Sequence, residues 1–189
     1  MTDDLDPRIA RSRTAVLDAA TELLAEEGYD GFTVDAVVAR SGVAKTTIYR
    51  HWPTKLDLLT AAINCFGDQV PAPDTGALRD DLVALLSHLA DDLANHQWSK
   101  SLPTIIERAE HDPELAEQHA ALVRAKSAAL RVVLDRAKAR GDVRKDADIE
   151  VAFAALAGPL FFRRLVLHDR TTDKQVEHIV DQALRGLAT

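Results

Sequence analysis

The segment that most constrains this chain has the pattern of two short helices joined by a glycine turn. It runs from Phe32 to Leu56 and reads FTVDAVVARSGVAKTTIYRHWPTKL. Thr33 is a good N-cap for the first helix, Gly42 suits the tight turn, and Pro53 ends the second helix. Thr54 with Asp57 indicates a variant capping box for the helix that follows. The second helix carries hydroxyl, aromatic and basic side chains. This is the layout of a helix-turn-helix unit that reads the major groove of DNA.

The rest of the chain shows helical periodicity, without the regular alternation that marks strands. We therefore expect an all-α protein of about nine helices, with an N-terminal three-helix head and a C-terminal helical-bundle regulatory domain. The expected helices cover residues 7–27, 34–41, 45–52, 55–67, 77–95, 99–111, 113–140, 146 or 148 to 167, and 172 or 173 to 187. The expected domains are residues 1–53 and residues 54–189. The resemblance described below implies DNA binding for the first, and ligand binding and dimerisation for the second.

Charge is distributed unevenly along the chain. The net charge of −7 argues against a nucleic-acid partner if it is taken alone. Between Val37 and Leu56, however, every charged residue is basic, and three arginines lie upstream of this segment. These basic residues are Arg40, Lys45, Arg50 and Lys55, preceded by Arg8, Arg11 and Arg13. Because phosphate contact needs basic residues only at the docking surface, we expect a basic head on an acidic body.

Several classes of protein are excluded by what the sequence lacks. The first residues, MTDDLDP, have no apolar signal region, and no apolar stretch reaches the ~18 residues that span a membrane. The single Cys65 cannot form an internal disulfide, and no pair of His residues has the spacing of a helical metal site. Glycine-rich phosphate loops and common nucleophile motifs are missing. We expect a cytoplasmic protein that is not an enzyme and has no cofactor or metal.

The second helix of the unit has distinct faces when it is plotted at about 100° per residue. Ile48 and Trp52 share the side that packs on the preceding helices. The opposite side suits base edges, because Arg binds guanine in bidentate fashion and Thr offers a hydroxyl or a methyl group. The residues on that side are Thr46, Thr47 and Arg50. The residues placed for phosphate contact are Thr33, Tyr49, His51 and Lys55.

This segment closely resembles the DNA-binding head of the TetR family of bacterial transcription regulators. The likeness covers residues 8–67 and rests on Gly-Val, Lys-Thr-Thr-Ile-Tyr-Arg-His-Trp and Pro-Thr-Lys, with Gly-Tyr-Asp-Gly-Phe-Thr upstream. Two positions depart from the family pattern: Val38 replaces the usual Ala, and Ala44 removes a helix cap that contributes ~1 kcal/mol. The resemblance implies DNA contacts by Thr33, Lys45, Thr46, Thr47, Tyr49, Arg50, His51 and Lys55.

Residues 151–162 are apolar nearly all round, so this helix is expected to be buried on both sides. It is either the central helix of a monomeric bundle or a helix that faces a second subunit through small residues. The small residues are Ala154, Ala155 and Gly158. The family resemblance implies a homodimer formed by the last two helices of each subunit, with Phe162, Ile179 and Ala183 also in the interface. Such a dimer fits a pseudo-palindromic operator in double-stranded DNA.

A pocket for a small-molecule effector is implied by the resemblance alone. Its expected lining is Phe66, Leu86, Leu89, Trp98, Leu102, Ile105, Ile106, Leu122 and Phe153, with polar contacts available from His88, Gln97 and His119. We therefore expect a repressor that a small-molecule effector releases from its operator. Two alternatives stay open. One is a helical small-molecule-binding protein or enzyme without a DNA role, and the other is an effector-independent activator or architectural DNA-binding protein.

Overall fold

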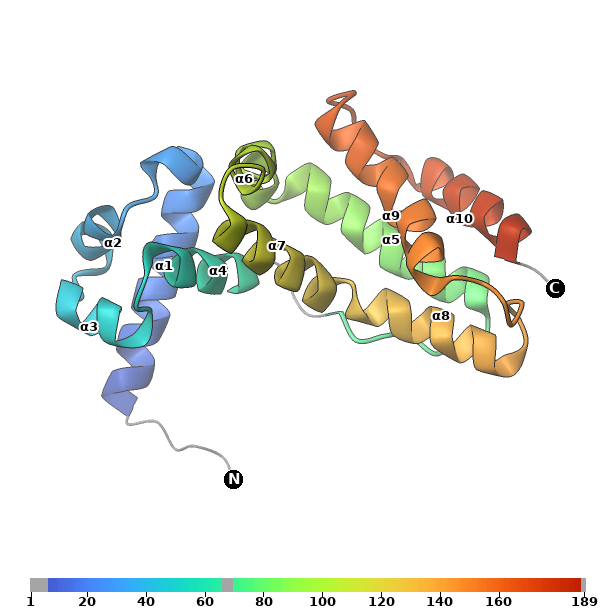
Figure 1. Ribbon diagram of the computed structural model, residues 1–189, viewed down its shortest axis with the longest axis horizontal. Helices are drawn as coiled ribbons and strands as arrows, with labels where there is room; N and C mark the ends of the chain where they lie inside the picture. Colours follow the sequence, from blue (N-terminus) through green and yellow to red (C-terminus); the bar gives the residue numbers. More distant parts are fainter. Residues whose placement is uncertain (1–6, 66–69, 188–189) are drawn as a thin grey trace. The chain divides into compact units, whose positions relative to one another are not determined.

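The computed structural model describes residues 7–65 and 70–187, and every regular element in these ranges is a helix (Figure 1). The elements are α1 (Pro7–Gly31), α2 (Val34–Ser41), α3 (Lys45–His51), α4 (Lys55–Cys65), α5 (Leu78–Asn95), the 3-10 helix η1 (Gln97–Lys100), α6 (Leu102–Ala109), α7 (Pro113–Lys126), α8 (Ala128–Arg140), α9 (Ile149–Leu165) and α10 (Asp173–Leu187). This confirms the all-α prediction. Within the same ranges, no helix is both long enough and apolar enough to cross a membrane.

The chain packs as two compact units. The head unit comprises Met1–Asp68 and Gln97–Leu122, and the bundle unit comprises Gln69–His96 and Val123–Thr189. The head unit therefore adds α4, η1, α6 and most of α7 to the three helices of the helix-turn-helix. The domain boundary predicted at residue 53 divides the chain by role, whereas these units divide it by packing, so that boundary stays a prediction.

The head unit has one apolar core to which α1, α2, α3 and α4 all contribute. Val37 and Ile48 have no exposed surface, and Trp52 keeps only 5% of its surface exposed. Ile105 from α6 and Leu115 from α7 belong to the same core. Burial of one such side chain stabilises the fold by about 1.5–3 kcal/mol. The predicted inward side of the second helix, which is now α3, is therefore the side that packs.

Local capping explains where α2 and α3 begin and end. The Thr33 side-chain oxygen accepts a hydrogen bond from the Ala36 amide at 3.1 Å, which satisfies a free donor at the start of α2. Gly42 ends α2 in the left-handed conformation, with φ of 69°, and its amide donates to the Val38 carbonyl. Ala44 makes no side-chain cap for α3, as the sequence indicates. Packing must therefore hold α3 where capping does not.

Two further helix starts use a reciprocal pair of side-chain hydrogen bonds. The Thr54 amide donates to the Asp57 carboxylate at 2.9 Å, and the Asp57 amide donates to the Thr54 hydroxyl oxygen at 3.0 Å. Thr172 and Gln175 form the same arrangement at the start of α10. The second pair is a capping box, in which two free amides are satisfied at once, and the first is a variant of it with Asp in place of Glu or Gln. The variant predicted at Thr54 and Asp57 is confirmed.

The helix expected over residues 113–140 is interrupted at Ser127, which divides it into α7 and α8. The buried Ser127 hydroxyl donates to the Arg124 carbonyl at 3.1 Å, and it accepts a hydrogen bond from the Arg131 guanidinium. A serine hydroxyl that bonds to nearby backbone competes with regular helical hydrogen bonding. The prediction of one continuous helix is therefore wrong at this residue.

The bundle unit is built from α5, α8, α9 and α10. Its fully buried apolar side chains come from all four helices and include Leu82, Leu86, Leu134, Leu156, Leu160, Val176 and Val180. An exposed ion pair joins α5 to α10, with the Arg79 Nε donating to Asp181 at 2.7 Å. The buried Asp81 carboxylate accepts hydrogen bonds from the Thr75 amide and hydroxyl at 3.0 and 2.8 Å. These polar contacts fix the loop before α5 without leaving a buried charge unpaired.

Two glycine substitutions should have opposite effects on stability. Gly42→Ala should lower the free energy of unfolding by about 1–2 kcal/mol, because a Cβ disfavours the left-handed conformation at φ 69°. Gly186→Ala, within α10 and with nothing near the added Cβ, should raise it by roughly 0.5–1 kcal/mol. Urea denaturation of the full chain, followed by circular dichroism, measures both. A neutral Gly42→Ala variant would contradict the assigned turn.

Candidate functional site

The outer face of α3 carries side chains that can reach DNA. Thr46 and Arg50 are exposed, and Thr47 is half-buried beside them. The side chain of Arg50 makes no hydrogen bond or ion pair with another residue in the ranges 7–65 and 70–187. Its guanidinium is therefore available to a ligand, and a bidentate contact to guanine O6 and N7 is the one its geometry suits best.

Other cations of the head are already engaged with acidic side chains. The Lys45 ammonium lies 2.6 Å from Asp35, and this hydrogen bond raises the pKa of Lys45. Arg40 lies 2.8 Å from Glu26. Both pairs are exposed, and exposed ion pairs contribute little to stability because water competes for them. A phosphate could therefore replace Asp35 at Lys45 at small cost.

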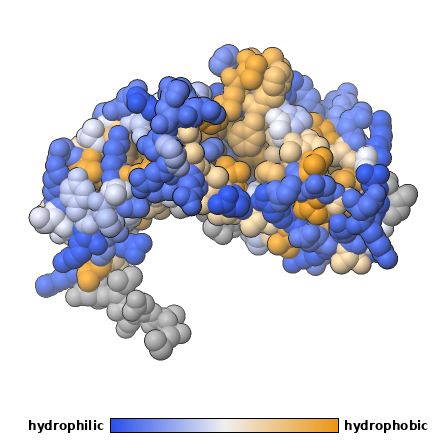
Figure 2. All heavy atoms as spheres, in the orientation of Figure 1, coloured by the Kyte–Doolittle hydropathy of each residue, from blue (hydrophilic) through white to orange (hydrophobic). Residues whose placement is uncertain are grey.

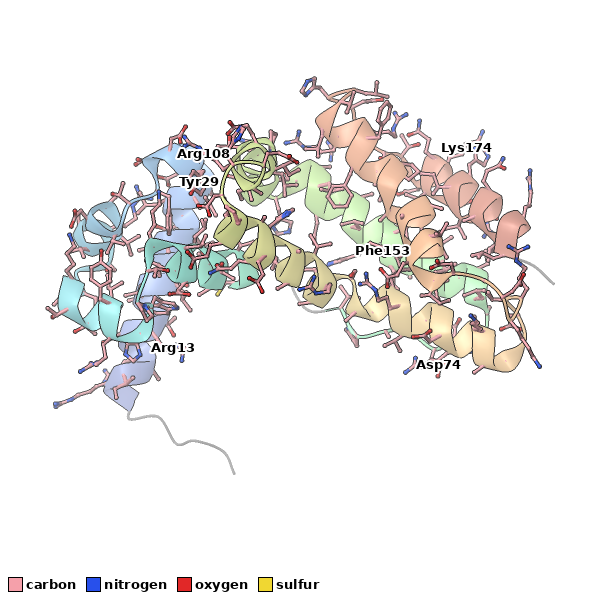
Figure 3. All side chains as sticks on the ribbon, viewed as in Figure 1. Arg13, Tyr29, Asp74, Arg108, Phe153 and Lys174 are labelled. Carbon is pink, nitrogen blue, oxygen red and sulfur yellow. The ribbon has the colours of Figure 1, made fainter. Side chains whose placement is uncertain are left out.

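Lys55 is half-buried and its ammonium lies over aromatic rings. Its ammonium lies 4.6 Å from the centroid of the Tyr29 ring, and burial lowers its pKa, although the nearby Asp30 acts in the opposite direction. The Arg108 guanidinium lies 5.5 Å from the same ring and 2.8 Å from Asp30 (Figure 3). Cations that contact a ring face are held by the ring's quadrupole. The role of Lys55 as a phosphate contact stays a prediction.

The end of α3 is packed by aromatic contacts. His51 and Trp52 meet edge to face with ring centroids 5.7 Å apart, and the Arg13 guanidinium lies 5.7 Å from the Trp52 ring (Figure 3). The His51 Nε2 is buried and lacks a hydrogen-bond partner among the described residues. Tyr49 is 41% exposed, so its hydroxyl is better placed than His51 for a phosphate. Sequence spacing gave no signal for the contact between Arg13 and Trp52, which are far apart in the chain.

A small cavity of about 10 Å³ lies within the head unit, large enough for about one water molecule. Its lining comes from α4, α6 and α7 and consists of Leu59, Thr60, Ile63, Ile105, Leu115, Gln118, His119 and Leu122. The Thr60 hydroxyl donates a hydrogen bond to the Gln118 side-chain oxygen, which joins α4 to α7. Burial lowers the pKa of His119, so its imidazole is neutral at pH 7.

The residues expected to line an effector pocket are divided between the two units. Ile105 and Leu122 line the cavity, and the head unit also holds Leu102 and Ile106. The remaining described members, Leu86, Leu89 and Phe153, belong to the bundle unit. Phe66 and the side chains of Trp98 and Gln97 lie outside the described residues. Sequence reasoning missed Leu59, Thr60, Ile63, Leu115 and Gln118, because the apolar face of a helix does not show where a space remains.

Two polar clusters of the bundle unit involve residues expected near a ligand. The Phe153 ring has the Arg131 guanidinium 4.7 Å from its centroid, and Arg131 forms a bidentate pair with Glu150 at 2.8 and 2.7 Å (Figure 3). His88 lies 3.5 Å from Asp92 on α5. The described residues contain no group of three or more His, Cys, Asp or Glu that could hold a metal ion.

An open groove of about 400 Å³ runs between α9 and α10 of the bundle unit. Its lining is mostly apolar and consists of Ala155, Pro159, His178, Ile179, Gln182 and Ala183. Ala154 and Gly158 are also exposed on α9, and Phe162 leaves 54% of its surface exposed. Figure 2 shows apolar surface gathered over the C-terminal part of α9, where Val166 and Leu167 are also exposed. All six predicted interface residues therefore lie at or near an accessible apolar surface.

Two protein-family models and a relative match most of the chain. Residues 16–62 match the family model for bacterial regulatory proteins of the tetR family, and residues 72–183 match the model for tetracyclin repressor-like C-terminal domains. The chain is 31% identical over 183 residues to the uncharacterized HTH-type transcriptional regulator YdeS of Bacillus subtilis, which covers 96% of this chain and 92% of that protein.

Two further relatives are similar over nearly their whole length. The chain is 33% identical over 186 residues to the DNA-binding transcriptional repressor TetR of Mycobacteroides abscessus, which covers 93% of this chain and 95% of that protein. A crystal structure of the TetR family transcription regulator SCO0332 superimposes with a TM-score of 0.78 at 31% identity, over 95% of this chain and 100% of that one. The family model that matches residues 16–62 includes the whole of α3.

Acid should destabilise the fold through His119. Because burial lowers the pKa of this group from its ordinary value of 6.5, the unfolded chain takes up a proton at a higher pH than the folded chain does. The contribution of neutral His119 to the free energy of unfolding is complete above pH 6.5. It is lost as the pH falls from 6.5 toward the pKa of His119 in the folded state. His119→Gln should therefore lose less stability than the wild type between about pH 7 and pH 5 in urea denaturation. The exposed His111→Gln serves as a control and should match the wild type.

Proposed function

Because the chain belongs to the TetR family of bacterial regulatory proteins, whose members are DNA-binding transcription regulators, we propose that it represses transcription and that a small-molecule effector releases it from its operator. The observation that carries this proposal is the outer face of α3. There, Arg50 is exposed and unpaired within the described ranges, and Thr46 is exposed on the same face. The relative from Mycobacteroides abscessus carries the name of a repressor, which favours repression over activation.

The packing of the head unit supports control by an effector. The helix α4 begins at Lys55, directly after the reading helix α3, and its residues Leu59, Thr60 and Ile63 line the cavity. A molecule that enlarges this cavity must displace α4 relative to α7. Such a molecule binds the displaced state more tightly, and that differential affinity is what shifts the population away from the DNA-bound state.

A homodimer would supply the second reading head. The groove between α9 and α10 and the exposed Phe162 on α9 form a surface that a second copy can cover. A two-fold axis there would place two α3 helices on half-sites about 34–36 Å apart, or a multiple of that distance, along a pseudo-palindromic operator. The protein would act in the cytoplasm, where bacterial DNA lies.

The test of DNA reading is a gel shift at stated salt on the DNA upstream of the protein's own gene. Arg50→Ala should weaken specific binding by roughly 1–3 kcal/mol and relax the preference at one base position, since a bidentate contact to guanine is lost. Arg124→Ala removes an exposed Arg from α7 and should leave affinity unchanged. If the Arg50 variant keeps its affinity and sequence preference, α3 is not the reading helix.

The dimer is tested by placing a charge on its proposed apolar surface. Phe162→Glu should convert the dimer to a monomer at micromolar concentration, because a carboxylate buried without a partner costs several kcal/mol. It should also abolish operator binding, since one head has too few contacts. Val132→Glu on the exposed side of α8 is the matched control and should stay dimeric. Light scattering measures both variants, and a monomeric wild type would refute the dimer.

A further inference from the structure

The cavity in the head unit is lined without any formal charge. Five of its eight lining residues are apolar, namely Leu59, Ile63, Ile105, Leu115 and Leu122. The other three are Thr60, Gln118 and His119, which are polar. Because burial lowers the pKa of His119, this side chain is uncharged at pH 7 as well. The lining therefore offers apolar contact and a few hydrogen bonds, and it offers no counter-ion.

A charged ligand would lose its hydration in this cavity and gain no compensating ion pair. The Arg108 guanidinium of α6 is not part of the cavity lining and pairs with Asp30 at 2.8 Å. Removing an ion from water costs several kcal/mol in proteins unless a partner charge and hydrogen bonds offset it. An uncharged polar group needs only its hydrogen bonds.

The hydrogen bond from Thr60 to Gln118 is the polar contact that a ligand between α4 and α7 would meet first. The Gln118 side-chain oxygen is the acceptor in this bond. If α4 and α7 separate without a substitute, that partly buried oxygen loses its donor, which is unfavourable. A ligand hydroxyl can donate to Gln118 instead, while the Thr60 hydroxyl turns to the backbone carbonyl one turn earlier in α4.

We infer that the effector is an uncharged, largely apolar molecule with one hydrogen-bond donor, which binds between α4 and α7 and takes the place of Thr60 on Gln118. This inference rests on the proposed function and specifies the chemistry of its effector. At about 10 Å³ the cavity is too small for such a molecule, so the effector binds the state in which the two helices have separated.

The test uses an enlarged cavity and four probes of matched shape. Leu115→Ala in the full chain removes a buried side chain from the lining, and cavities made in this way take up small aromatic molecules. Calorimetry gives the dissociation constants of benzyl alcohol, toluene, benzoate and benzylammonium. Benzyl alcohol should bind at least about tenfold more tightly than either ion, because neither charge finds a partner. It should also bind more tightly than toluene.

Further variants separate the chemistry of the site from general effects. Adding Gln118→Leu to Leu115→Ala should abolish the preference for benzyl alcohol over toluene and keep toluene binding. Val132→Ala, which trims an exposed apolar side chain on α8, should bind none of the probes. If Leu115→Ala does not fold, Ile63→Ala opens the same cavity from α4.

The outcomes distinguish the inference from the function on which it rests. Equal or tighter binding of benzoate or benzylammonium, or the absence of binding by all four probes, overturns the inference. Operator affinity is measured separately by fluorescence anisotropy, with and without benzyl alcohol. If benzyl alcohol binds with the expected selectivity and operator affinity does not change, the ligand chemistry stands and the proposed release from DNA fails.

Discussion

The burial of Ile48 and Trp52 beneath α3 is the interaction on which the DNA-reading surface depends. The helix has seven residues and lacks a side-chain cap at Ala44, and isolated helices of that length are not stable in water. Tertiary packing must therefore supply its stability. Because the two buried residues fix the rotation of α3 about its axis, they also determine that Thr46 and Arg50 point outward.

The helix α4 has a double role because of its position in the chain. Its N-terminus follows the reading helix after three residues, and its middle lines the cavity through Leu59, Thr60 and Ile63. The head unit is one compact body, so a shift of α4 cannot be absorbed without repacking against α1. A densely packed core transmits such a shift, because it adopts one of two discrete arrangements more readily than it deforms continuously.

The features that were predicted correctly from sequence are those set by local chemistry. The start of α2 at Thr33 and the paired hydrogen bonds of Thr54 and Asp57 follow from residues within one turn of each other. The break at Ser127 escaped prediction, because the periodicity continues through it and the contact with Arg131 appears only in three dimensions. The stretch from Val37 to Leu56 has no acidic residue, but Asp35 lies just before it and forms an ion pair with Lys45, which the charge pattern of the stretch did not predict. Which apolar side chains enclose a space also depends on packing, which periodicity does not encode.

The ion pairs of Lys45 with Asp35 and of Arg40 with Glu26 have a consequence for selectivity. In the free head, the carboxylates of Asp35 and Glu26 already compensate part of the positive charge. A phosphate that binds Lys45 therefore replaces one anion with another. Release of condensed counterions drives the binding of basic proteins to any DNA, and a compensated head draws less on that source. Under the proposed function, ordinary chromosomal DNA is then a weak competitor, and a larger share of the binding free energy comes from the bases that Arg50 is proposed to read.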